Sequence, residues 1–206
     1  NTDAAAITVN TAWAKENNIT DLASFIAYCT DHPGEVKMGG SSAGSVWHVA
    51  GGYLMNATGI DIQMVAYPDG AASAVKAAAQ NEINGVTVSA AEARSFVESG
   101  DLTMLGIMDT VRNSVFPDVP TCEEQGYECL YATQRGMGLP LGVDDEVFEV
   151  LSKACAAAIE DPDFVAAMEA LGQKIDYLDG PAYGEYLAQA AVDVPAAMAV
   201  VGLLDE

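Results

Sequence analysis

A short glycine- and serine-rich stretch, Gly40-Ser41-Ser42-Ala43-Gly44, has the residue types and the spacing of a catalytic motif. It matches the pattern G-x-S-x-G, in which a serine on a sharp turn between a strand and a helix attacks an acyl group. In that interpretation Ser42 is the nucleophile of a serine esterase. The same letters also describe a strand end, a turn of small residues and a helix N-terminus, which together bind anions. The stretch is therefore compatible with bond cleavage and with reversible binding.

The histidines argue against the esterase. The α/β-hydrolase triad follows the chain order serine, acid, histidine, and this chain has only His32 and His48. His32 precedes the serine. His48 follows it on the predicted helix just beyond the turn, so it cannot arrive from a separate loop to act as the base. Lys37 suggests a serine–lysine dyad, but it lies on the preceding predicted strand and nothing there indicates desolvation.

Reversible binding uses the same atoms and needs no base. The hydroxyls of Ser41, Ser42 and Ser45 can donate hydrogen bonds, and the free N–H groups at the start of the next helix point into the turn. The helix dipole also favours a carboxylate, each contribution being on the order of 0.3–2 kcal/mol. An ordinary N-cap without a ligand is the alternative that the local sequence leaves open.

Alternating strand and helix patterns must position this turn. Residues 34–109 consist of three strand–helix pairs and a closing strand. This alternation predicts an α/β fold with a parallel sheet covered by helices on both faces. Ligands bind such sheets beyond the carboxyl ends of the strands. Ser89 and the turn Tyr67-Pro68-Asp69-Gly70-Ala71 fall at the same edge as the first turn.

The pattern changes after this alternation, and we expect a domain boundary there, with one unit at 10–108 and a second at 109–206. The second unit is mostly helical in pattern, with a further short strand expected at 174–180. The sequence contains no internal repeat, and no low-complexity linker separates the two units.

Composition limits the classes of partner. Thirty acidic and eight basic residues among 206 give a net charge of −22, which argues against a nucleic-acid partner. No apolar run is long enough to predict a membrane span, and the first residues lack the pattern of a signal peptide. An anionic ligand is repelled at long range by this charge, so local N–H groups must supply the attraction.

The four cysteines do not form a metal or redox motif, because the chain has no C-x-x-C. Cys122 and Cys129 either pair in an oxidising compartment or remain buried thiols. Cys29 and Cys155 fall on apolar helix faces and are expected in the core.

The order of motifs resembles that of the tripartite tricarboxylate transporter substrate-binding proteins, the TctC or Bug family. "GEVKMGGSSAGSVWHVAGGYLMNATGIDIQMVAYPDGAASAV" is similar to the family's "PGKLTYGSSGVGSxxH" followed by "VDIVHVPYKGGAPAL". "SGDLTMLGIMDTVRNSVFPDVPTCEEQGY" is similar to "AGKLRALAVTSxxRSPxLPDVPTxxEAG", and "DPDFVAAMEALGQKID" to "DPEVRERLAALGAEPV". The resemblance runs through essentially the whole chain.

The resemblance implies a periplasmic, two-lobed receptor that captures a small organic acid and delivers it to membrane permease subunits, without catalysis or a cofactor. A ligand-sensing module for signalling differs only in its partners. The unit at 10–108 corresponds to the second, ligand-gripping lobe, and 109–206 to the C-terminal part of the first. The ligand contacts implied, through amides and hydroxyls, are Ser41, Ser42, Gly44, Ser45, Tyr67, Asp69, Gly70, Ala71 and Ser89.

Three departures from the family pattern affect what we expect. Asp69 replaces a glycine, either as a plain turn residue or as a partner for an amine-bearing ligand. Arg135 falls where the family has an aromatic residue, either solvated or offering a charge-assisted bond to an anion. The family also has roughly another third of chain before the segment that matches residue 1. We therefore expect an exposed apolar surface that promotes self-association, and weak ligand affinity unless that part is supplied.

Overall fold

The computed structural model describes residues 1–204. Five strands follow the order β3-β2-β4-β1-β5, and a sixth, β6, pairs with β1. The strands are β1 (Thr2–Asn10), β2 (Lys37–Gly39), β3 (Gln63–Val65), β4 (Gly85–Ser89), β5 (Leu102–Ile107) and β6 (Ala132–Gln134). The helices are α1 (Thr11–Glu16), α2 (Leu22–Asp31), α3 (Val46–Thr58), α4 (Ala71–Ala79), α5 (Ala90–Ser99), α6 (Asp145–Ile159), α7 (Pro162–Ala170) and α8 (Gly180–Val200), with a 3₁₀ helix η1 (Glu123–Gln125).

The sheet confirms the α/β fold class and corrects the all-parallel pairing that we predicted. β2 pairs in parallel with β3 and with β4, as strand–helix alternation requires. β1 instead lies antiparallel between β4 and β5. Helical crossovers set the common direction of β2 to β5. β1 lies outside the alternating region at 34–109, so its direction could not be read from the alternation.

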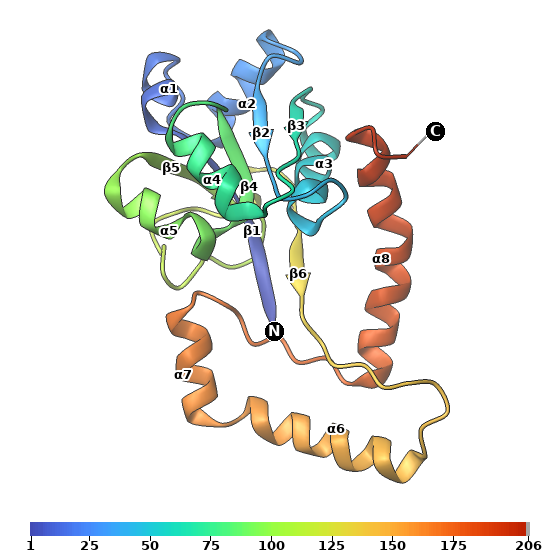
Figure 1. Ribbon diagram of the computed structural model, residues 1–206. Coiled ribbons are helices and arrows are strands. Elements are labelled where there is room, and N and C mark those ends of the chain that lie inside the picture. Colours follow the sequence, from blue (N-terminus) through green and yellow to red (C-terminus); the bar gives the residue numbers. More distant parts are fainter. Residues whose placement is uncertain (205–206) are drawn as a thin grey trace.

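β1 is shared between two parts of the sheet. Its residues from Ala5 to Val9 pair with β4, whereas Thr2 to Ala4 pair with β6. Thr2 also forms an isolated bridge with Lys174. In Figure 1, β1 accordingly descends from the main body of the molecule towards the N-terminus, where β6 runs beside it.

Helices cover both faces of the sheet, as predicted. On one face the Thr87 hydroxyl donates a hydrogen bond to the Trp47 carbonyl of α3 at 2.9 Å. On the other face α4 packs over β2, where Gly39 leaves room for Ala74. α8 runs alongside α3 (Figure 1), and Gly52 of α3 lies against the backbone of Ala197.

Helices begin after residues that favour an N-cap and end at glycines that favour a C-cap. Asp21, Ser45 and Ser89 each precede a helix, and the side chain of each accepts a backbone N–H of the first turn, which satisfies one free donor. Gly59 and Gly100 follow α3 and α5 with φ of 71° and 85°. This left-handed conformation suits glycine and closes both helices.

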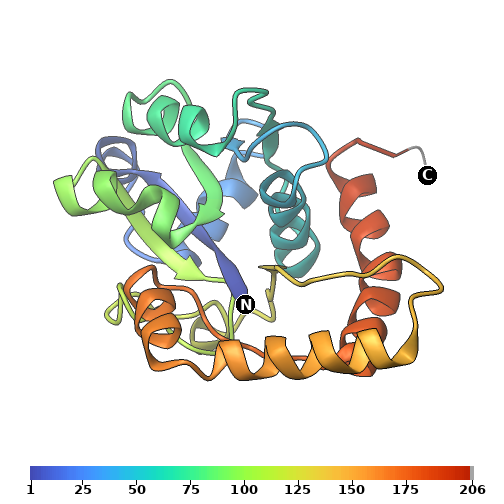
Figure 2. The ribbon, with the colours of Figure 1, turned by 60° about the horizontal axis from the view of Figure 1, so that its bottom comes forward.

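Burial is very uneven between the two parts of the chain. Within the described residues, every buried apolar residue except Ala197 lies between Ala5 and Cys129. α6 and α7 contain no buried residue, and Ala197 is the buried residue of α8. Figure 2 shows these three helices framing the end of β1. This part of the chain therefore contains little core of its own.

The strand predicted at 174–180 is wrong, since only Lys174 forms a bridge there. A strand needs a neighbouring ladder along its whole length, and the remainder of this segment borders a cavity instead. In the described part of the chain, no helix combines the length and apolar character that a membrane span needs.

The cysteines are free thiols. Cys122 and Cys129 are both buried and close enough to interact, and this contact, together with burial, raises the pKa of Cys129 well above its usual range. Burial raises the pKa of Cys29 to about 12. Cys155 is only partly buried and approaches Met137, contrary to the core position expected.

Candidate functional site

Two turns meet at the edge of the sheet beyond the carboxyl ends of β2 and β3. The Tyr67 N–H donates to the Ser41 carbonyl at 2.8 Å, which ties the second turn to the first. Within the turns, the Ser45 N–H donates to Ser42 and the Gly70 N–H donates to Tyr67, both at 3.0 Å. The structure therefore brings together the two turns that the sequence predicted to lie at one edge.

The first turn leads into α3. The Ser45 side chain accepts the His48 N–H at 3.4 Å, whereas the amides of Val46 and Trp47 have no hydrogen-bond partner among residues 1–204. Ser42 and Gly44 are exposed, and Gly44 has φ of 73°. Exposed hydroxyl and amide donors next to the positive end of a helix dipole form an arrangement that attracts carboxylates.

The second turn leads into α4, whose N-terminus has no side-chain cap. Gly70 precedes the helix with φ of 100°, a conformation that a residue with a Cβ rarely adopts. Asp69 is exposed and makes no ion pair in the described part of the chain, whereas Ala71 is buried. The α4 amides are thus a second set of donors beside the first, with one carboxylate at their edge.

Tyr67 contributes more to packing than its prediction as a ligand contact suggests. Its ring is partly buried and lies beside Gly39, in the space between β2 and α4. Burial, reinforced by the negative charge of Glu82, raises the pKa of the Tyr67 hydroxyl. The ring anchors the second turn to the sheet, and its backbone N–H positions the first.

Ser89 lies at the end of β4 and is 1% exposed. Its hydroxyl accepts the Glu92 N–H, and its own N–H donates to the Glu92 carboxylate, both at 3.3 Å. This is a capping box at the start of α5. Like Ser45, Ser89 therefore has partners within the protein for both its hydroxyl and its N–H group.

A charged group that the sequence did not assign to the site lies next to Ser89. The Asp3 carboxylate accepts a hydrogen bond from Arg135 at 3.1 Å. Desolvation raises the pKa of Asp3, while Arg135 and Ser89 oppose that rise. Desolvation also raises the pKa of Glu92. The charge of Asp3 raises this pKa further, whereas the charge of Arg135 and a contact with the Trp47 indole lower it. These groups therefore extend the site from the start of α3 to the end of β6.

Among residues 1–204, neither histidine forms a hydrogen bond with Ser42. His48 is 3% exposed, and neither of its ring nitrogens has a hydrogen-bond partner among residues 1–204. His32 stacks on Tyr28 and contacts Glu35. Within the described residues, no group of three or more potential metal ligands gathers either. The donors of the turn therefore remain available to a ligand.

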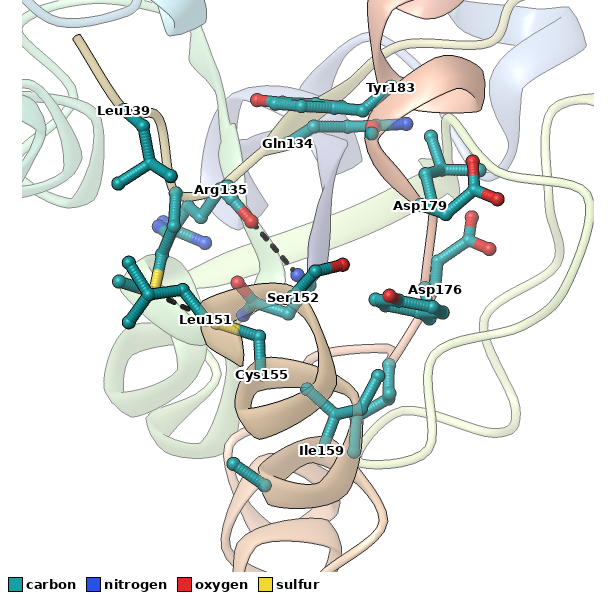
Figure 3. A pocket seen from close by; sticks show the side chains of 18 of the residues that line it. Gln134, Arg135, Leu139, Leu151, Ser152, Cys155, Ile159, Asp176, Asp179 and Tyr183 are labelled. Atoms are coloured by element: carbon teal, nitrogen blue, oxygen red, sulfur yellow. Dashed lines mark hydrogen bonds between the residues drawn. The ribbon is translucent and has the colours of Figure 1, made fainter. Parts of the chain in front are cut away.

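A cavity of about 490 Å³ is lined by Arg135, by residues of α6 and by the segment 175–180. Figure 3 shows Arg135, Leu139 and Leu151 on one side of it, Asp176 and Asp179 on the opposite side, and Ile159 of α6 between them. A second cavity of about 310 Å³ lies between the start of β1 and α7. Neither cavity is lined by residues of the two turns, so the turns lie outside both cavities.

Comparison with known proteins identifies relatives of the chain. The family model described as "Tripartite tricarboxylate transporter family receptor" matches residues 4–192. A TctC solute-binding protein from Polaromonas, solved without ligand, is 27% identical with a TM-score of 0.78, covering 99% of this chain and 67% of its own. The curated relatives are longer, and this chain spans between 45% and 57% of their length.

Two further solved structures share the fold at lower identity. "R. palustris Rpa4515 with adipate" has a TM-score of 0.81 at 19% identity, covering 98% of this chain and 66% of that one. "MatC (Rpa3494) from Rhodopseudomonas palustris with bound malate" has a TM-score of 0.75 at 20% identity, covering 97% and 67%. Both neighbours bind a dicarboxylate on the same architecture.

Proposed function

Since the chain belongs to the tripartite tricarboxylate transporter family receptors, we propose that it is an extracytoplasmic receptor that captures a small organic acid for membrane permease subunits. Family members are solute-binding proteins, and solved neighbours bind adipate and malate. The observation that carries the proposal is the junction of the α3 and α4 N-termini through the Tyr67–Ser41 hydrogen bond. The amides of Val46 and Trp47 at the start of α3 have no partner among residues 1–204, and the start of α4 has no side-chain cap.

The proposal assigns direct ligand contacts to the two turns and to the helix amides behind them. The turn contacts are Ser41, Ser42, Gly44, Ser45, Asp69, Gly70 and Ala71. Tyr67 and Ser89 support them from the sheet side, through backbone and capping hydrogen bonds. We also propose that 10–108 and 109–206 form two lobes, because the core cluster lies mainly in the first unit and α6 of the second contains no buried residue.

Two other functions are less well supported. A serine esterase requires a base for Ser42, and both histidines are engaged or buried elsewhere. A Ser42→Ala variant separates the cases, since a receptor then loses some affinity while an esterase loses all hydrolysis of an activated ester. A sensor module has the same ligand site and differs only in its partners. Two permease genes next to the gene for this chain would favour transport over sensing.

A thermal-shift titration tests the receptor function, because a ligand that binds the folded state stabilises it in proportion to RT ln(1 + [L]/Kd) even when binding is weak. We expect millimolar succinate, malate or adipate to raise the melting temperature, and the corresponding diamides to leave it unchanged. No shift with any dicarboxylate would contradict the proposal.

A proline at the first position of α3 tests the amide contacts directly. Val46 is exposed, and Ser45 before it has ψ of 163°, which suits the residue preceding a proline. Val46→Pro therefore removes one N–H donor while a proline at this position remains compatible with the helix. We expect roughly tenfold weaker carboxylate binding, since a hydrogen bond to a charged group contributes about 1.5–3 kcal/mol.

Val46→Ala is the matched control, because it removes the same side chain and keeps the amide. We expect it to bind carboxylates like the wild type in an isothermal titration. Equal losses in both variants would show that the amide makes no contact with the ligand.

A further inference from the structure

Arg135 occupies a fixed place next to the shared strand β1. The residue follows β6, and its N–H donates to the Asn1 carbonyl at 2.9 Å, which extends the β1–β6 ladder by one pair. Thr133 lies directly opposite Asp3 in that ladder. Because side chains alternate along a strand, Asp3 and Arg135 are diagonal neighbours on one face, within reach of a long side chain.

The Asp3–Arg135 ion pair is strongly asymmetric in exposure. The Asp3 side chain is 7% exposed and the Arg135 side chain 47%, and one guanidinium nitrogen lies 3.1 Å from the carboxylate. An arginine has five N–H donors in a planar fork, and Asp3 is its only side-chain hydrogen-bond partner within residues 1–204. The buried carboxylate thus fixes the guanidinium, and the unused donors remain available on its exposed side.

Arg135 is also a basic residue in an acidic setting. Among the residues that line the larger cavity it is the only basic one, opposite Asp176 and Asp179 (Figure 3). Its charge acts on Glu92, which lies near the Trp47 indole in the first turn of α3. A ligand held by α3 and α4 whose second anionic group extends towards Arg135 is repelled by these carboxylates. The positive charge of Arg135 offsets this repulsion.

We propose that Arg135 contacts the ligand and selects dicarboxylates. One carboxylate binds the α3 and α4 amides, as the proposed function requires, and the other binds the exposed donors of Arg135. The buried Asp3 carboxylate is a positioning residue that holds the guanidinium in place. Charge-assisted bonds from the arginine fork are strong and directional, so the second carboxylate gains affinity at a place where the surrounding acids otherwise repel it.

Two ligands that differ only in the second carboxylate, adipate and hexanoate, test this assignment in titrations of the full chain. In the wild type we expect adipate to bind about tenfold more tightly than hexanoate, the difference typical of one charge-assisted contact. In Arg135→Gln we expect this preference to fall below about twofold, with hexanoate affinity unchanged. Arg135→Lys, which keeps the charge and loses the fork, should give an intermediate preference.

Arg94→Gln is the matched control. Arg94 is 46% exposed and pairs with Glu98 on the outer side of α5, so its loss makes the same change in net charge. We expect it to keep the wild-type preference for adipate. Melting temperatures without ligand, measured for every variant, identify any loss of folding.

The outcomes separate this inference from the function on which it rests. If the wild type binds adipate and Arg135→Gln keeps the preference, or loses affinity for both ligands equally, Arg135 is not a ligand contact and the receptor function stands. If the wild type binds neither ligand at millimolar concentration, the receptor function fails and the assignment of Arg135 fails with it.

Discussion

Individual residues of the site differ in how far the sequence reveals them. The small residues from Ser41 to Ser45 form a local pattern, a strand end followed by a helix cap, and this pattern placed them correctly at the sheet edge. The Asp3–Arg135 pair could not be found in this way, because it depends on the pairing of two strands more than a hundred residues apart. The packing of Tyr67 depends on Gly39 across the sheet in the same manner.

His48 gives a prediction at this scale. Burial lowers the pKa of His48 below its ordinary 6.5, so the folded protein binds this proton less readily than the unfolded chain. The associated stability is complete above pH 6.5 and declines as the pH falls through the folded-state pKa. We expect His48→Leu to lessen the fall in melting temperature between about pH 7.5 and about pH 5, relative to the wild type.

His32→Gln is the control for that measurement, because His32 is 43% exposed and its charge remains accessible to water. We expect its melting profile to follow the wild type. An unchanged pH dependence in His48→Leu would mean that the buried imidazole does not control acid stability.

At the scale of elements, β2 to β5 and helices α3 to α5 agreed with the predicted alternation, and the misses share one physical cause. Helix α1 and the direction of β1 were not predicted, and the strand expected at 174–180 did not form. Caps, turns and periodicity act over a few residues and can be read locally. The pairing direction of β1, and the absence of a ladder beside 174–180, depend on neighbours that are distant in sequence.

The contact between α3 and α8 gives a prediction at this scale. A Cβ added at Gly52 would lie only 2.2 Å from the Ala197 carbonyl oxygen, so Gly52→Ala forces the two helices apart. We expect a loss of about 1–3 kcal/mol, as for other overpacked cores, measured by urea unfolding. Gly184→Ala on α8 is the control: a Cβ there meets nothing within 4 Å, so the variant should be as stable as the wild type or up to about 1 kcal/mol more stable.

Little change in Gly52→Ala would show that α8 adjusts without cost and is not packed tightly on α3. Destabilisation in both variants would instead indicate that alanine disturbs either helix regardless of its surroundings.

The whole molecule combines a well-packed part with a thinly covered one. α6 and α7 present exposed Phe148, Val150, Leu151 and Phe164 beside the 490 Å³ cavity. This agrees with the exposed apolar surface that the family resemblance led us to expect. The shape of this surface depends on how the three last helices are arranged around β1, which no local pattern gives.

Self-association is the prediction that belongs to this scale. Apolar surface favours it, whereas a net charge of −22 opposes it. Salt screens the repulsion and leaves the apolar attraction, so sedimentation velocity should show more dimer at about 0.5 M than at about 0.02 M NaCl. Leu151→Gln should reduce the dimer without changing the net charge, and Val111→Gln, which lies outside α6 and α7, should not. A monomer in both salt conditions would refute the prediction.

The change of partner along β1 has a mechanical consequence. Ala4 still pairs with β6 and Ala5 already pairs with β4, so a single peptide unit belongs to both ladders. Any rotation of the part around β6 relative to the part around β4 must change the backbone torsions of that peptide unit, which then acts as a hinge. A small angular change there becomes a displacement of several ångströms at the distant ends of α6 and α4, where side chains are far from the axis.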